Sequence, residues 1–129
     1  VIDEVDPLDP ETITQVVLCT GKVYFDLLQA RRTRELNHVA LVRIEQLYPF
    51  PRADFDAVID RYPKARLYVW CQEEPQNQGA WYQIRHRLQE PLRDHQNLYY
   101  AGRPASAAAR SGILSIWRVW SAISLRLRR

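Results

Sequence analysis

The sequence of 129 residues and 15.2 kDa is long enough for one domain with a sizeable core and too short for two ordinary domains. Its hydrophobic content of 47% and charged content of 26% are typical of globular proteins and exclude a disordered chain. Two cysteines without a CxxC spacing exclude a disulfide framework and a zinc module, and they favour a reducing, cytoplasmic compartment.

The positive charge of the chain is concentrated in its C-terminal part. Residues 1–102 hold 12 basic and 15 acidic residues, whereas residues 103–129 hold six arginines and no acid. The pI of about 9.1 therefore describes the tail, and the acidic body gives no reason to expect a nucleic-acid partner. No uncharged apolar run approaches the ~20 residues of a membrane-spanning helix, and the acidic start is not a secretion signal.

The first twelve residues carry five acids and two prolines and predict a connector from an upstream domain. Beyond them, apolar runs typical of buried strands alternate with apolar residues at helical spacing. Strands are predicted at 15–19, 39–44, 67–71 and 98–101, with helices at 23–34, 55–62 and 81–90. A βαβαβαβ order with short connections predicts a three-layer α/β fold, with a mostly parallel sheet and helices on both faces.

Thr20-Gly21-Lys22 lies where the first strand passes to the first helix. Glycine permits a tight turn, and the N–H groups and dipole of a helix start attract an anion. Lys22 adds a positive charge, but a P-loop is excluded because Val23 follows the lysine and no earlier glycine exists. The segment is therefore an ordinary turn or a subsite for phosphate or carboxylate. Basic residues near the end of the same helix are predicted to form a solvated patch: Arg31, Arg32 and Arg34.

The segment QEEPQNQGAW, residues 72–81, follows the third strand. Its polar groups therefore lie at the carboxyl edge, where open α/β sheets build their sites. Its two adjacent carboxylates point in different directions and have no nucleophile beside them, which favours a structural turn or an interface over direct chemistry. Asn77 or Gln78 is predicted to cap the next helix, and Trp81 is predicted to be a core residue or an interface anchor.

No catalytic set can be assembled from these residues. His38, His86 and His95 have no metal-ligand spacing among themselves, and we assign none of them a catalytic role. The sequence contains no serine-hydrolase, metalloprotease, Walker or dinucleotide-binding signature. We therefore expect no catalytic residue, no metal site and no cofactor bound by this chain alone.

Four stretches together resemble one family: CTGKVYFDL at 19–27, VRIEQLYPFP at 42–51, VWCQEEPQNQGAW at 69–81 and YAGRPASA at 100–107. They are similar in wording, order and spacing to the thiamine-diphosphate-dependent first (decarboxylating) component of bacterial 2-oxoglutarate dehydrogenase. The resemblance covers residues 13–107 and implies the C-terminal domain of that enzyme, whose fold is like that of the transketolase C-terminal domain.

The resemblance implies a role in a larger enzyme. The family decarboxylates 2-oxoglutarate on thiamine diphosphate with magnesium, in the tricarboxylic acid cycle, and transfers succinyl to lipoyl groups of the dihydrolipoyl succinyltransferase component. Its catalytic histidines and diphosphate–metal motif belong to upstream domains, which this chain lacks. The fragment is therefore expected to be inactive alone and to contribute to a homodimer interface and to domain positioning.

In some relatives this domain also helps to form a regulatory site for acetyl-CoA or AMP. Carried onto matching positions, the resemblance implies effector contacts by Thr20, Gly21, Lys22 and Arg32. It implies interface or regulatory contacts by Gln72, Glu73, Asn77, Gln78 and Trp81. The alternative is a stand-alone α/β module that senses a nucleotide or an acyl-CoA without catalysis.

Residues 108–129 depart from the family pattern. Their acid-free composition, rich in Arg, Ser and Trp, indicates translation in a shifted reading frame, a hypothesis that an intact frame on resequencing would contradict. The alternative is a basic amphipathic helix that lies on anionic membranes. Co-sedimentation of the whole chain and of a 1–106 truncation with anionic vesicles tests that alternative.

Overall fold

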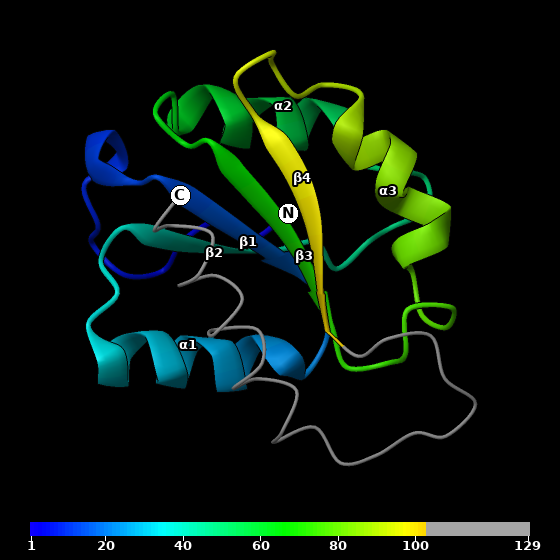
Figure 1. Cartoon of the computed structure of the whole chain (residues 1–129), viewed down its shortest axis with the longest axis horizontal. Helices are drawn as coiled ribbons and strands as arrows, with labels where there is room; N and C mark the ends of the chain where they lie inside the picture. Colours follow the sequence, from blue (N-terminus) through cyan, green and yellow to red (C-terminus); the bar gives the residue numbers. More distant parts are fainter. Residues whose placement is uncertain (103–129) are drawn as a thin grey trace.

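Four parallel strands form the central sheet, in the order β2-β1-β3-β4. The computed structural model describes residues 1–102 (Figure 1). The strands are β1 (Gln15–Cys19), β2 (Val39–Arg43), β3 (Leu67–Gln72) and β4 (Asn97–Gly102). Each predicted strand is present with bounds that differ by at most one residue, and the predicted parallel sheet is confirmed.

Helices cover both faces of the sheet, as predicted. The helices are α1 (Val23–Arg34), α2 (Arg52–Arg61) and α3 (Trp81–Gln89), with a short 3-10 turn at Pro10–Thr12. Figure 1 shows α1 on one side of the strands and α2 and α3 on the other. Among the helices of residues 1–102, none has both the length and the apolar character needed to cross a bilayer.

Alternating side chains of the strands build two apolar layers, because successive strand residues point to opposite faces. From β1, Val16 and Leu18 pack in the layer that contains the apolar residues of α2 and α3. Val17 and Cys19 pack in the layer under α1, with Leu27. Burial on both faces explains why the strands read as continuous apolar runs rather than as alternating ones.

The helix α2 begins three residues before the predicted position. It starts at Arg52, immediately after Pro51, and the N–H of Phe55 donates to the carbonyl of Pro51 at 3.0 Å. Proline fits the start of a helix because its missing N–H has no intrahelical partner there. Apolar spacing alone identifies the buried face of a helix and does not show where its exposed first turn begins.

The prediction of a solvated basic patch at the end of α1 is wrong for Arg31. That residue is 2% exposed, and its guanidinium pairs with the carboxylates of Glu4 and Asp6. Arg31 lies one turn after the fully buried Leu27, so both face the sheet. Residues 1–6 lie along β2, where Ile2 and Arg43 form an antiparallel bridge. The tail predictions for 103–129 lie outside the described residues.

Candidate functional site

The two predicted contact segments leave neighbouring strands at one edge of the sheet. Residues 20–22 follow β1, and residues 73–80 follow β3, which pairs with β1 so that Cys19 lies opposite Cys71. The strand order places β2 on one side of β1 and β3 on the other. The carboxyl ends of β1 and β3 therefore form the topological switch point, where doubly wound α/β proteins bind ligands.

The turn after β1 exposes the beginning of α1. Gly21 has a φ of 75°, in the left-handed region that glycine adopts readily, and an added Cβ there would meet nothing within 4 Å. The backbone angle, rather than lack of space, therefore requires glycine. Lys22 is the N-cap of α1, and it makes no side-chain capping bond within the described part of the chain. Gly21 and Lys22 are exposed and Thr20 is half-buried, so helix N–H groups and a cation lie together.

Arg32 does not join this turn. It lies in the last turn of α1, whereas Lys22 precedes the first, and ten residues of helix separate the two by about 15 Å. Its guanidinium instead binds the carboxylate of Asp6, with Nε–Oδ2 and Nη2–Oδ1 distances of 2.9 and 2.6 Å. The hydrogen bond from Arg32 is the main reason that the pKa of Asp6 is lowered to about 2, with burial opposing and Arg31 assisting the shift.

Gln72 is buried and organises the loop after β3. Its side-chain oxygen accepts hydrogen bonds from the indole Nε1 of Trp70 at 2.8 Å and from the backbone N–H of Trp81 at 3.1 Å. Its side-chain nitrogen donates to three carbonyls of the loop, the shortest bond being 2.7 Å to Gln78. Both ends of the amide are thus used within the chain, so Gln72 shapes the loop from inside.

The remaining loop candidates lie nearer the surface. Glu73 is half-buried, whereas Asn77 and Gln78 are exposed. Gly79 has a φ of 69°, and a Cβ there would lie 3.0 Å from Oε2 of Glu74, so the loop folds tightly on itself. The loop presents polar side chains outward on a backbone held from within, an arrangement that suits an interface.

The prediction that Asn77 or Gln78 caps α3 is wrong. The N-cap residue is Ala80, and the first helical N–H, that of Trp81, donates to the side chain of Gln72 instead. Gln72, at the end of the strand before the loop, therefore supplies the hydrogen-bond acceptor that an N-cap side chain next to the helix usually supplies. Sequence spacing could not identify this contact, because it joins residues nine positions apart.

Trp81 was predicted to be either a core residue or an interface anchor, and in the described part of the chain it is a core residue. The side chain is 7% exposed and belongs to the layer between the sheet and α3. Its ring centroid lies 5.3 Å from that of Tyr100 on β4. Within residues 1–102 it packs against its own sheet.

Arg43 is a candidate that the sequence motifs missed. Its guanidinium carbon lies 4.6 Å from the ring centroid of Tyr24 and 5.2 Å from that of Phe25. Its Nε donates to Glu45 at 2.8 Å, and Phe25 is 60% exposed. Such stacking is a cation–π interaction. It forms a partly exposed cluster of one arginine and two aromatic side chains beside the start of α1. The one available signal was a charged residue at the end of the apolar strand VALVR.

The cysteines do not suit a nucleophilic role. Cys19 and Cys71 are free and buried, and burial raises the pKa of Cys19 to about 12 and raises that of Cys71 as well. A thiol with a raised pKa has little of the reactive thiolate at neutral pH. In the part of the chain that the structure describes, no group of three His, Cys, Asp or Glu side chains could hold a metal ion.

The strand order and the two helical layers define a doubly wound α/β domain of the transketolase C-terminal type. A family model described as 2-oxoglutarate dehydrogenase C-terminal matches residues 1–120. The chain belongs to that family, which confirms the resemblance.

Three curated relatives are similar to this chain over most of its length. It is 52% identical over 118 residues to the 2-oxoglutarate dehydrogenase E1 component of Coxiella burnetii. This alignment covers 90% of this chain and 13% of that protein. It is 50% identical over 116 residues to the protein of that name from Haemophilus influenzae, covering 90% and 12%. For Cupriavidus necator the identity is 48% over 112 residues, covering 87% and 12%. The chain thus spans a small part of these relatives' length.

Proposed function

We propose that this chain serves as the C-terminal domain of a thiamine-diphosphate-dependent enzyme that decarboxylates 2-oxoglutarate in the tricarboxylic acid cycle and passes succinyl to lipoyl groups. The observation that carries the proposal is the 52% identity over 118 residues to the Coxiella burnetii E1 component. The described residues contribute a sheet edge with polar loops, and the reacting groups belong to other parts of the enzyme.

Thiamine diphosphate and magnesium are held elsewhere in this proposal. Magnesium on a diphosphate is usually held by one or two carboxylates together with phosphate oxygens and water, and within residues 1–102 no group of three His, Cys, Asp or Glu side chains converges. Our proposal assigns this pair of cofactors to other domains of the enzyme. The chain would instead form part of the homodimer interface and position the domains that bind them.

Further partners follow from the same assignment. The dihydrolipoyl succinyltransferase component would receive the succinyl group from the whole enzyme, and nucleic acid is not a partner. A cytoplasmic location accords with two free cysteines, since thiols persist in reducing compartments.

A domain replacement tests the assignment. Residues 1–107 of this chain would replace the matching segment of the Coxiella burnetii relative, and the molecular mass and 2-oxoglutarate decarboxylation of the chimera would be measured. We expect a dimer with activity within about a hundredfold of the parent, because a slight misplacement caused by changes far from the reacting groups can cost about that factor. A chimera that folds but forms neither a dimer nor an active enzyme would refute the proposal.

The isolated chain gives a second, independent measurement. With thiamine diphosphate, magnesium and 2-oxoglutarate, the purified 129-residue protein is expected to release no carbon dioxide above the rate without protein. Turnover by the isolated chain would show that the reacting groups lie within it and would overturn the assignment of chemistry to other domains.

The exposed turn at residues 20–22 supports a second role, as a contact for the phosphate groups of acetyl-CoA or AMP. Exposed Lys22 and the N-terminal N–H groups of α1 provide the positive potential. Arg32 would contribute only after releasing Asp6. Glu73, Asn77 and Gln78 would provide interface or regulatory contacts, with Gln72 and Trp81 supporting them from within.

Calorimetry separates this effector role from a stand-alone sensing module. Micromolar binding of acetyl-CoA or AMP by the isolated chain, lost in Lys22→Ala, would favour a module that senses the ligand alone. Binding by the active chimera and not by the isolated chain would favour a site completed by other domains. Equal binding by the Lys22→Ala chimera would exclude Lys22 as the phosphate contact.

A further inference from the structure

The strand β2 lies at an edge of the sheet, with β1 on its inner side. Its first four residues are buried, so it is an apolar strand whose outward N–H and C=O groups have no neighbouring strand within the described sheet. Proteins usually block such edges, because an open edge pairs with strands of other molecules. The groups that satisfy the outer side of β2 therefore decide whether this edge is open or closed.

Three odd-numbered residues present their backbone groups outward. The N–H of Ile44 donates to the carbonyl of Cys19 on β1 at 2.8 Å. Because backbone groups of successive strand residues point to opposite sides, the backbone groups of Val39, Leu41 and Arg43 point away from β1. At Arg43, both the N–H and the C=O bond to Ile2 at 2.8 Å. The N–H of Leu41 donates to the carboxylate of Glu4 at 2.8 Å.

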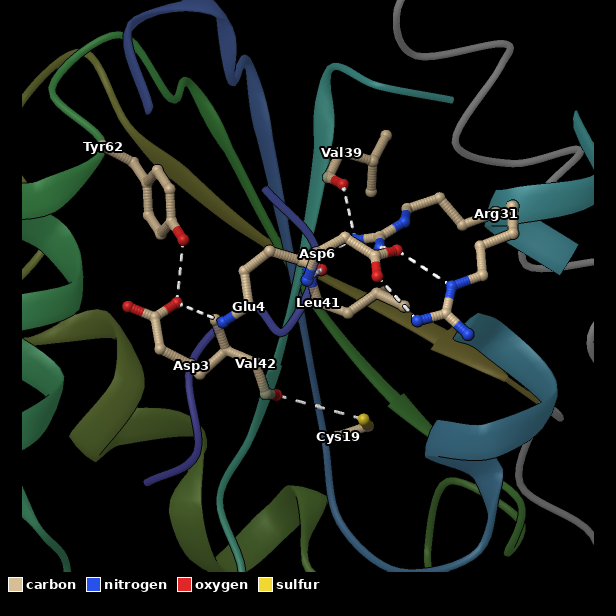
Figure 2. A network of polar contacts seen from close by, with 10 residues as sticks. Asp3, Glu4, Asp6, Cys19, Arg31, Val39, Leu41, Val42 and Tyr62 are labelled. Atoms are coloured by element: carbon tan, nitrogen blue, oxygen red, sulfur yellow. Dashed lines mark hydrogen bonds and ion pairs between the residues drawn. The ribbon is translucent and has the colours of Figure 1, made fainter. Parts of the chain in front are cut away.

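A side chain of α1 adds to the closure. The Nη1 of Arg31 donates to the carbonyl of Val39 at 3.3 Å and also pairs with Glu4 (Figure 2). The side chains of Arg31 and Glu4 are only 3% and 4% exposed. The carboxylate thus stands where the carbonyl of a neighbouring strand would accept, and the guanidinium stands where its N–H would donate.

Contacts to both helical layers hold the covering segment in place. Asp3 accepts a hydrogen bond from the hydroxyl of Tyr62 at 2.8 Å (Figure 2). Asp3 also pairs with Arg61, the last residue of α2, at 3.1 Å. Asp6 pairs with Arg31 and Arg32 on α1. Residues 1–6, hereafter the edge strap, therefore span the outer side of β2 from one helical layer to the other.

We propose that the edge strap guards a latent strand-pairing surface on β2, and that its opening lets β2 pair with β2 of a second copy of this chain. The outward residues are Val39, Leu41 and Arg43, placed symmetrically about Leu41, and the N–H of Val39, which bonds to the carbonyl of Leu36 at 3.3 Å, must also be released for pairing. An antiparallel pair of two such edges sets Leu41 opposite Leu41 and Val39 opposite Arg43, which is the self-complementary pattern of a twofold interface. Glu4 and Arg31 prevent this pairing by occupying the same groups.

The test compares two alanine variants of the full 129-residue chain. Glu4→Ala removes the acceptor for Leu41, and Glu11→Ala removes an exposed acid of the same N-terminal region, whose pair with Lys64 is 3.8 Å long. Because Glu4→Ala leaves Arg31 buried without Glu4, a double variant, Glu4→Ala with Arg31→Met, removes both buried charges together. Circular dichroism identifies the variants that keep the fold.

Amide hydrogen exchange measures the closure itself. In the unmodified chain, the Leu41 amide should exchange within about tenfold of the Ile44 amide, which bonds inward to β1. In a folded Glu4→Ala or double variant, Leu41 should exchange at least about tenfold faster, and Ile44 should be unchanged. Fast Leu41 exchange in the unmodified chain, or unchanged exchange in the folded double variant, would refute the guard.

Light scattering over a range of concentrations measures the pairing. The strap variants are expected to form dimers at concentrations where the unmodified chain and Glu11→Ala keep their lower mass. Addition of Leu41→Pro to a strap variant should abolish the dimer in a protein that keeps the fold by circular dichroism, because proline lacks the N–H that pairing uses. Association equal in all variants, or a dimer that persists in the proline variant, would refute pairing through β2.

Discussion

The side-chain oxygen of Gln72 accepts a hydrogen bond from the backbone N–H of Trp81, nine residues further along the chain. The same oxygen accepts from the indole of Trp70. One buried amide therefore joins the last residue of β3 to the first residue of α3 and fixes the loop between them. The contact residues of that loop depend on a side chain that itself points inward.

Replacement of this amide should destabilise the domain. Gln72→Ala is expected to lower the free energy of unfolding by about 2–4 kcal/mol, because it leaves buried donors and acceptors without partners. Urea denaturation followed by tryptophan fluorescence measures the change. Gln78→Ala is the matched control, since that side chain is exposed and the backbone carbonyl is kept, and its cost should stay below about 0.5 kcal/mol. Equal losses would contradict the role of the buried amide.

Adjacent aromatic residues at the start of α3 should differ sharply. Trp81 is 7% exposed and Tyr82 is 45% exposed. Trp81→Ala is expected to cost about 3–5 kcal/mol through the cavity it leaves, whereas Tyr82→Ala should cost about 1 kcal/mol or less. Thermal and urea unfolding measure both. A similar small cost at the two positions would place Trp81 outside the core.

Acid should weaken the attachment of the edge strap through Asp6. Its pKa is lowered from 3.8 to about 2 in the folded chain, so its stabilising effect is fully present above about pH 4 and is lost as the pH falls through 2. In Asp6→Asn, the loss of unfolding free energy between about pH 5 and pH 2 should be smaller by about 1 kcal/mol.

The control for this titration is Asp94→Asn, which removes an exposed carboxylate from the loop before β4. It should follow the unmodified chain across the same pH range. If the free energy of unfolding of Asp6→Asn and of the unmodified chain changed with pH in parallel, the ion pairs of Asp6 with its arginine partners would not stabilise the folded chain.

Both cysteines should resist thiol reagents in the folded chain. Burial raises the pKa of Cys19 to about 12, and it also raises the pKa of Cys71, so little thiolate forms near pH 8. Reaction with an aromatic disulfide reagent should therefore be at least about a hundredfold slower than in the chain unfolded by guanidinium. Rapid labelling of either thiol without unfolding would contradict its burial.

Local patterns were sufficient for the elements of this fold. The run QVVLC and the spacing of Val23, Tyr24 and Leu27 predicted β1 and α1, because buried strands and helices impose their own periods on the sequence. The beginning of α2 was less well predicted. Its first turn is exposed and carries no apolar signal.

The positions of the candidate residues were predictable where the rule for parallel strands applied. Residues 20–22 and 73–80 follow strands, and parallel strands end at one edge, so both segments lie there. Arg31 and Arg32 were not predictable, because their partners lie 25 or more positions earlier in the chain. Arg43 stacks on aromatic rings of another element for the same kind of reason.

The sequence by itself determined the alternation of strands and helices, the apolar residues that fill the two layers, and the family. Each of these depends on patterns of residues that are close together in the chain. Only the tertiary structure decided which basic side chains are buried, which strand lies at the edge, and that Glu4 and Arg31 close it. These depend on pairings between distant segments. Such pairings form when the chain is folded, since a charge becomes buried only where a partner from elsewhere offsets its loss of water.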